Sequence, residues 1–146
     1  MHRFLEWHAS QFMTKDVKTV TADLNLHDLE ALFDRYDFNA FPVMDGERVA
    51  GLVTKFDFLK AFIFTTNQVF PHYDNLMKRT VGEVMTKDVA SVDVEAPLTR
   101  VLELMIKLKA RSFPVLNGEY RLAGMISRED LMRALHLSTE EANGLQ

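Results

Sequence analysis

The sequence predicts an α+β protein that contains two copies of one strand–helix–strand–strand–helix unit. The first observation is a series of short motifs that occurs twice in the same order. Met-Thr-Lys-Asp-Val stands at 13–17 and 85–89, Phe-Pro-Val at 41–43 and 113–115, and each copy continues with a glycine and a Thr/Ser-x-x-Asp motif. The second observation is that short alternating stretches precede longer runs with helical spacing in both copies. Motifs that recur in one order indicate an internal duplication.

The first copy begins with a predicted strand at 17–21, where apolar and polar side chains alternate. A helix is expected from Leu26 to Tyr36, because leucine and aromatic residues recur there on one helical face. Asn25 directly precedes this run, and we expect it to be the N-cap residue.

A hairpin and a second helix complete the first copy. We expect strands at 41–44, starting at Pro42, and at 49–53. Asp45-Gly46 between them is typical of a tight turn. Thr54 is expected to start the helix that follows, because Phe58, Leu59, Phe62 and Ile63 then form an apolar stripe.

The second copy repeats this pattern. The sequence predicts a strand at 91–94, a helix that opens at Pro97, a hairpin of strands 113–116 and 122–126, and a last helix. Residues after Ser138 are polar, and we expect them to fray.

We expect one module, 1–146, in which repeat 1 spans 9–66, a connection spans 67–80, and repeat 2 spans 81–138. A repeat of about 60 residues buries too little surface to be comfortably stable alone, so the two should share a core. Residues 1–12 are expected to form a short amphipathic helix that packs through Trp7.

The composition is that of a globular domain, with 47% apolar and 26% charged residues. The chain has no cysteine, which excludes disulfides and thiol chemistry, and no apolar run approaches the length of about 20 residues that spans a bilayer. A net charge of −4 gives no basic footprint for nucleic acid, and the N-terminus lacks the features of a signal peptide. We therefore expect a cytoplasmic protein that binds neither membrane nor nucleic acid.

The sequence holds no complete catalytic motif, and its five histidines form no pair at metal-ligand spacing. We therefore predict neither an enzyme nor a metal site. The aspartates of the two Thr/Ser-x-x-Asp motifs stand at equivalent repeat positions, which favours two equivalent binding positions over a catalytic pair.

Together these motifs resemble the CBS domain, the regulatory repeat of cystathionine beta-synthase, in the tandem arrangement called a Bateman module. The resemblance covers about residues 9–138. It implies two repeats related by a pseudo-two-fold axis, with their sheets packed face to face and a cleft on each side of the interface. It also implies adenosine-containing ligands in those clefts, namely AMP, ADP, ATP or S-adenosylmethionine, without a tightly bound cofactor, and assembly into a homodimer.

The Thr/Ser-x-x-Asp motifs are the main candidate binding residues. On the residues alone they are close to capping boxes, so helix capping explains them without any ligand. The resemblance gives them a further role, in which Thr54 and Ser127 contact phosphate or ribose and Asp57 and Asp130 accept from the ribose hydroxyls.

The resemblance also implies a base pocket in each repeat, lined by the segment that enters the first strand. Its candidate residues are Thr14, Val17 and Thr19 in repeat 1 and Thr86, Val89 and Ser91 in repeat 2. The repeated Met-Thr-Lys-Asp-Val also has a purely structural explanation, as one turn made twice.

Asn39 and Arg111 occupy equivalent positions three residues before a proline. Arginine is the better phosphate partner, because its guanidinium stays charged and donates two parallel hydrogen bonds. We therefore expect two unequal clefts, with a monophosphate or no ligand in the cleft served by Asn39. A solvated surface arginine is the alternative.

The sequence therefore predicts a regulatory module that senses an adenosine nucleotide and signals to a partner protein, which the sequence does not identify. The alternative is a constitutive dimerisation or protein-interaction module without a nucleotide ligand. The ligand's identity, the number of occupied clefts and the direction of regulation stay open.

Overall fold

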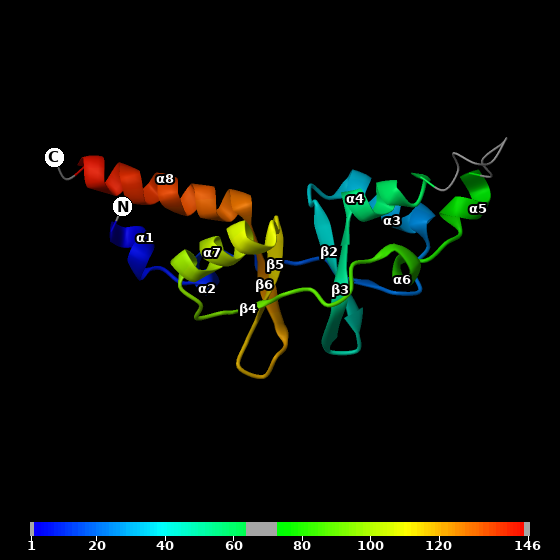
Figure 1. Cartoon of the computed structure of the whole chain (residues 1–146), viewed down its shortest axis with the longest axis horizontal. Coiled ribbons are helices and arrows are strands. Elements are labelled where there is room, and N and C mark those ends of the chain that lie inside the picture. The colour runs from blue at the N-terminus through cyan, green and yellow to red at the C-terminus, as the bar shows by residue number, and fades with distance from the viewer. Residues whose placement is uncertain (1, 64–72, 145–146) are drawn as a thin grey trace. The chain divides into compact units, whose positions relative to one another are not determined.

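The structure is a computed structural model that describes residues 2–63 and 73–144. It contains two compact units, and each has a three-stranded sheet flanked by helices (Figure 1). Unit 2 is the continuous stretch Lys18–Val89, whereas unit 1 joins the segment up to Val17 with the chain from Ala90 onward. Residues 67–72 of the predicted connection lie outside the described residues.

The elements of unit 2 are β1 (Val20–Thr21), α3 (Leu26–Arg35), β2 (Ala40–Asp45), β3 (Arg48–Thr54), α4 (Lys55–Lys60), α5 (Tyr73–Met77) and α6 (Val81–Val84). Those of unit 1 are α1 (His2–Glu6), α2 (Ala9–Phe12), β4 (Val92–Asp93), α7 (Leu98–Leu108), β5 (Ser112–Leu116), β6 (Leu122–Ser127) and α8 (Arg128–Gly144). The predicted α+β class and the order strand, helix, strand, strand, helix are confirmed in both units.

The central strand of each sheet pairs in parallel with a short strand and antiparallel with its hairpin partner. In unit 2, Val43 faces Gly51 and Met44 faces Val49, so Ala50 is an extra residue in a β-bulge. The register of the unit 1 hairpin shifts at the equivalent place. Gly46 closes the unit 2 hairpin with φ of 62°, the left-handed conformation that the turn requires.

β2 starts at Ala40, so the prediction that it starts at Pro42 is wrong by two residues. The parallel strand β1 is also shorter than predicted. Val20 faces Val43, which places Thr19 beside Pro42, and a proline nitrogen has no hydrogen to donate. The parallel ladder therefore extends no further toward the N-terminus, and β4 begins only at Val92 for the same reason, because Ser91 lies beside Pro114.

Each unit buries a core of its own, on one side of its sheet. The unit 2 core consists of Val20, Leu26, Leu29, Phe41, Val43, Val53, Ala61, Met77 and Val81. The unit 1 core consists of Phe4, Trp7, Ala9, Phe12, Val92, Leu98, Val101, Met105, Phe113, Val115, Ile126, Leu131 and Ala134.

The short helix that precedes each repeat's first strand packs with the sheet of the other repeat. α2 precedes β1 in the sequence but contributes Ala9 and Phe12 to the unit 1 core. α6 precedes β4 but contributes Val81 to the unit 2 core. The compact units therefore exchange these segments relative to the sequence repeats.

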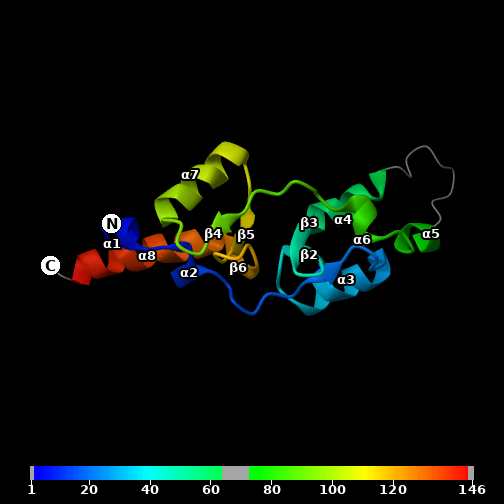
Figure 2. The ribbon, with the colours of Figure 1, turned by 90° about the horizontal axis from the view of Figure 1, so that it is seen from below.

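The last helix is longer than predicted. Instead of fraying after Ser138, α8 continues to Gly144 and lies alongside α1 (Figures 1 and 2). Ser138 is fully buried, and Arg3 forms an ion pair with Glu141 at 3.2 Å. Trp7 packs into the core as predicted, although it lies between two short helices and not within one. No helix in the described part of the chain is long and apolar enough to cross a membrane.

Candidate functional site

Two buried aspartates occupy equivalent places in the two units. Asp57 lies in the first turn of α4 with 2% of its surface exposed, and Asp130 lies in the first turn of α8 with 5% exposed. Carboxylates are rarely buried to this degree unless they are paired, so their partners define what else each can bind.

Both aspartates form the capping bonds that the sequence allowed. The Asp57 N–H donates to Thr54 Oγ1 at 2.9 Å, and the Thr54 N–H donates to Asp57 Oδ2 at 3.0 Å. In unit 1 the Ser127 N–H donates to Asp130 Oδ2 at 2.9 Å, and the Asp130 N–H donates to Ser127 Oγ at 3.3 Å. Capping therefore uses one carboxylate oxygen of each aspartate and leaves the other to further donors.

Asp57 has two further donors in unit 2. Lys60 Nζ lies 2.9 Å from Oδ1, and Thr86 Oγ1 lies 3.2 Å from each of the two carboxylate oxygens. Thr86 reaches this position because its backbone pairs with β3, donating to Leu52 O at 2.8 Å and accepting from Leu52 N at 3.0 Å. A Cβ on the neighbouring Gly51 would lie 2.3 Å from the Thr86 carbonyl oxygen, so this approach requires a glycine.

Asp130 has a different set of partners in unit 1. Arg133 donates from Nη1 to Asp130 Oδ1 at 3.1 Å and from Nη2 to the Phe12 carbonyl oxygen at 3.0 Å. Thr14 pairs with Met125 of β6, as Thr86 pairs with β3. Among the described residues, however, the Thr14 hydroxyl forms no hydrogen bond with Asp130.

Asn39 and Arg111 also lie at equivalent places, just before the central strands. The Lys55 N–H donates to the Asn39 carbonyl oxygen at 3.0 Å, and the Arg128 N–H donates to the Arg111 carbonyl oxygen at 3.0 Å. Each residue is therefore next to the first residue of the helix that carries the aspartate. The backbone of Arg111 thus lies at the Asp130 end of unit 1, and its side chain is exposed.

The predicted base-pocket residues of each sequence repeat are split between the two compact units. Thr14 and Val17 lie in unit 1, and Thr19 lies in unit 2. Thr86 and Val89 lie in unit 2, whereas Ser91 lies in unit 1. The two valines are half-buried, while Thr19 and Ser91 are exposed at the points where the prolines end the parallel ladders. Each compact unit therefore contains the aspartate of one sequence repeat and the Met-Thr segment of the other.

Sequence reasoning missed Lys60 and Arg133. Both stand three residues after their aspartates, at the spacing that brings side chains together on a helix, so the signal was present. The hydrogen bond between Thr86 and Asp57 was harder to predict from the sequence. It joins residues 29 positions apart, and it forms only because the Met-Thr segment packs in the unit of the other repeat.

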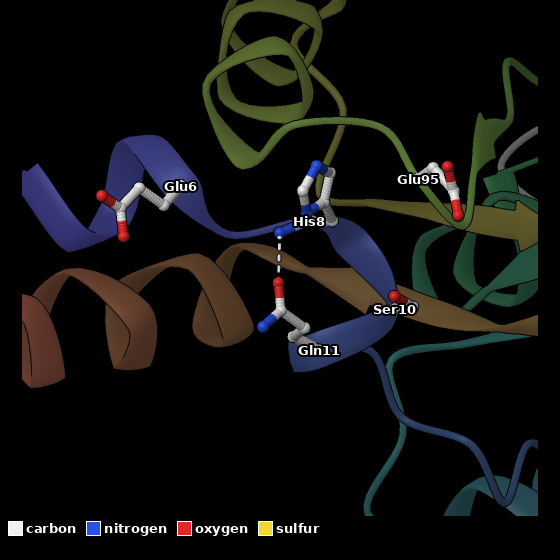
Figure 3. Close-up of a pocket in the computed structure, with 5 residues that line it drawn as sticks. All are labelled: Glu6, His8, Ser10, Gln11 and Glu95. Atoms are coloured by element: carbon white, nitrogen blue, oxygen red, sulfur yellow. Dashed lines mark hydrogen bonds between the residues drawn. The ribbon is translucent and has the colours of Figure 1, made fainter.

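Unit 1 also has a half-open pocket of about 400 Å³ that none of the predicted residues line (Figure 3). Its lining residues lie around the α1–α2 junction and after β4, and they are Glu6, His8, Ser10, Gln11 and Glu95. Gln11 Oε1 accepts from the His8 N–H at 2.8 Å, so its side chain fixes the backbone turn. No group of three metal-binding side chains occurs among the described residues, at this pocket or elsewhere.

A family model of the CBS domain matches residues 9–63 and 81–137 of the chain. Among curated proteins, the A-adding tRNA nucleotidyltransferase of Geobacter sulfurreducens is 30% identical over 132 residues, which are 90% of this chain and 14% of that enzyme. The chain therefore spans only a small part of this relative.

Solved structures share the fold. The structure of CBSX2 in complex with AMP has a TM-score of 0.77 and 21% identity, and the match covers 91% of this chain and 98% of that one. The CBS domain pair of the protein MJ0100, in complex with 5′-methylthioadenosine and S-adenosyl-L-methionine, has a TM-score of 0.76 and 21% identity, covering 90% of this chain and 98% of that one.

Proposed function

The chain belongs to the CBS-domain family, and on this premise we propose that it is a regulatory module that binds an adenosine-containing ligand. The observation that carries the proposal is the buried carboxylate in the same place of each unit, Asp57 or Asp130, beside a repeated Met-Thr segment. AMP, 5′-methylthioadenosine and S-adenosyl-L-methionine, which occur in the similar structures, share the adenosine that such a position would recognise.

The chemistry of a carboxylate suits the ribose of these ligands. An ionised carboxylate only accepts hydrogen bonds, and its two oxygens can accept from two neighbouring hydroxyl groups. Bonds to a charged acceptor are about twice as strong as those between neutral groups. Because capping and the ion pairs already hold each aspartate in place, a ligand would meet a preorganised acceptor.

Signalling to a partner protein would follow from a shift in population. A ligand that binds one conformation of the module better than another shifts the equilibrium toward that conformation. The size of the shift is set by the difference between the two affinities. In this role the module performs no chemical step of its own. We further propose that it acts as a homodimer.

The second candidate function is a protein-interaction module without a nucleotide. Two observations favour it: hydrogen bonds within the chain complete both capping boxes, and α4 presents Phe56 and Leu59 with 69% and 62% of their surfaces exposed. Apolar side chains exposed to this extent on one helix are common at protein contacts.

A thermal-shift titration separates the two candidates. AMP, ADP, ATP and S-adenosylmethionine are each added to the full chain. A ligand at 100 times its dissociation constant adds about 2.7 kcal/mol, which raises the melting temperature by several degrees. The matched control is 2′,3′-dideoxyadenosine 5′-monophosphate, which lacks the diol and should give a much smaller shift than AMP. If none of the four ligands shifts the melting temperature, the interaction module is the better description.

A further inference from the structure

We propose that the two binding positions are unequal, because the Thr86 hydroxyl blocks Asp57 from a ribose diol while Asp130 remains open to one. The inference rests on the proposed function and adds a specificity-determining residue to it. Thr86 and its repeat equivalent, Thr14, are the same amino acid in the same motif, so the difference lies in the structure and not in the residue type.

Asp57 accepts from three groups of its own chain. They are the Thr54 N–H, the Lys60 ammonium group and the Thr86 hydroxyl. The Thr86 hydroxyl lies 3.2 Å from both carboxylate oxygens, so it is placed between them and can donate to either one. A diol that bridges the two oxygens would need this same place, and a carboxylate has only about four lone-pair sites in all.

Asp130 accepts from only two groups among the described residues. The Ser127 N–H donates to Oδ2, and the Arg133 guanidinium donates to Oδ1. One lone pair on each oxygen therefore remains for a ligand, which matches the two hydroxyl groups of a ribose. Arg133 is also tied to the Phe12 carbonyl oxygen, so it holds the carboxylate without lying across it.

The positive charge near the two aspartates differs in the same direction. Arg111 lies beside Arg128 in unit 1, whereas the equivalent pair in unit 2 is Asn39 and Lys55. A phosphorylated adenosine therefore meets one more cation in unit 1 than in unit 2. Guanidinium groups also bind phosphate with better geometry than ammonium groups do.

The expected consequence is an order of filling. AMP should occupy the Asp130 position first, and the Asp57 position only after Thr86 has rotated away. Breaking one net hydrogen bond weakens binding by about 3- to 10-fold. Removing the Thr86 hydroxyl should therefore tighten AMP binding at the Asp57 position by the same factor. Thr86 is exposed, so alanine can replace it at little cost to packing, and alanine leaves the place of the hydroxyl empty.

Isothermal titration of the full chain with AMP tests the inference. In an Asp130→Asn background, which isolates the Asp57 position, Thr86→Ala should tighten AMP binding by about 3- to 10-fold. Thr86→Ser keeps the hydroxyl and should leave affinity unchanged. The control is Thr139→Ala in the same background, which removes an exposed hydroxyl outside the candidate binding residues and should leave AMP affinity unchanged.

The diol-lacking analogue gives an independent readout. Binding of 2′,3′-dideoxyadenosine 5′-monophosphate should not respond to Thr86→Ala, because this analogue has no hydroxyl groups to take the vacated place. The inference is overturned if Thr86→Ala leaves AMP affinity unchanged or weakens it, or if Asp57→Asn alone removes the tighter site of the unmodified chain. Absence of binding by AMP, ADP, ATP and S-adenosylmethionine to every variant overturns the proposed function itself, which is a different result.

Discussion

The backbone N–H of Phe4 donates to Ser138 Oγ at 3.2 Å and so joins α1 to α8 across 134 positions of the sequence. Both residues are buried, with 4% and 0% of their surfaces exposed. Ser138→Ala removes the acceptor and leaves a buried donor unsatisfied, which should lower the free energy of unfolding by about 1–3 kcal/mol. Urea denaturation measures this loss.

Thr139→Ala is the control for this prediction. Thr139 is exposed, and its hydroxyl donates to the Leu135 carbonyl oxygen within α8. Its removal should change the stability by no more than about 0.5 kcal/mol. Equal losses for the two variants would contradict the role assigned to Ser138.

Gly124 is predicted to tolerate no side chain. A Cβ there would lie 2.6 Å from the Thr14 carbonyl oxygen and 2.8 Å from Met13 Sδ. Gly124→Ala should force the Met-Thr segment away from β6 and lower the stability by about 1–3 kcal/mol. It should also lower the affinity for any ligand that binds beside Asp130. Thermal unfolding with and without AMP measures both effects.

Gly118 provides the matched control in the same unit. It lies in the β5–β6 turn, and a Cβ there would meet nothing within 4 Å. Gly118→Ala should leave the melting temperature nearly unchanged. A large loss in both variants would show that the hairpin as a whole, and not the contact with Thr14, is sensitive.

Lys109 ends α7 in the left-handed conformation, with φ of 55°. This conformation costs a non-glycine residue about 1 kcal/mol, and glycine adopts it freely. Lys109→Gly should therefore raise the stability by a few tenths to about 1 kcal/mol. Lys107→Gly, within the same helix, should lower it by about 1 kcal/mol. Chemical denaturation of the two variants checks that the signs are opposite.

The stability contributed by Glu83 should depend on pH. The hydrogen bond from the Arg79 side chain, with Nε 2.9 Å from Glu83 Oε2, holds the pKa of Glu83 below its ordinary value of 4.5. A lowered pKa in the folded state means that the contribution is present above 4.5 and is lost as the pH falls through the folded pKa.

Paired unfolding measurements on the unmodified chain and Glu83→Gln test this dependence. The unmodified chain should be the more stable at neutral pH, and the difference should shrink as the solution is acidified below the ordinary range of a glutamate. A difference that stayed constant with pH would show that the carboxylate charge does not matter.

Local signals in the sequence were sufficient for much of the fold. Asn25 caps α3 as predicted, because its side chain accepts from the Asp28 N–H at 2.8 Å, a bond that four neighbouring residues determine. The turn at Gly46 and the capping bonds of Thr54 are local in the same sense. Such features require no knowledge of what packs against them.

The remaining features depend on contacts between distant residues. The polar surface of the chain after Ser138 suggests fraying, but α1 provides partners for α8 there. The bond between Thr86 and Asp57 depends on which sheet the Met-Thr segment joins, and both copies carry the same motif. The repeat pattern alone does not distinguish a segment that packs on its own repeat from one that packs on the other.

The discontinuity of unit 1 has a consequence for synthesis of the protein in the cell. Unit 2, Lys18–Val89, leaves the ribosome as one piece, whereas α1 and α2 are made before it and their partners from Ala90 onward are made after it. Translation at about 5–20 residues per second makes this interval several seconds long. The core around Trp7 forms only after the chain from Ala90 onward has been made, so the fluorescence of this tryptophan would report the arrival of that later segment, not the emergence of the segment that contains it.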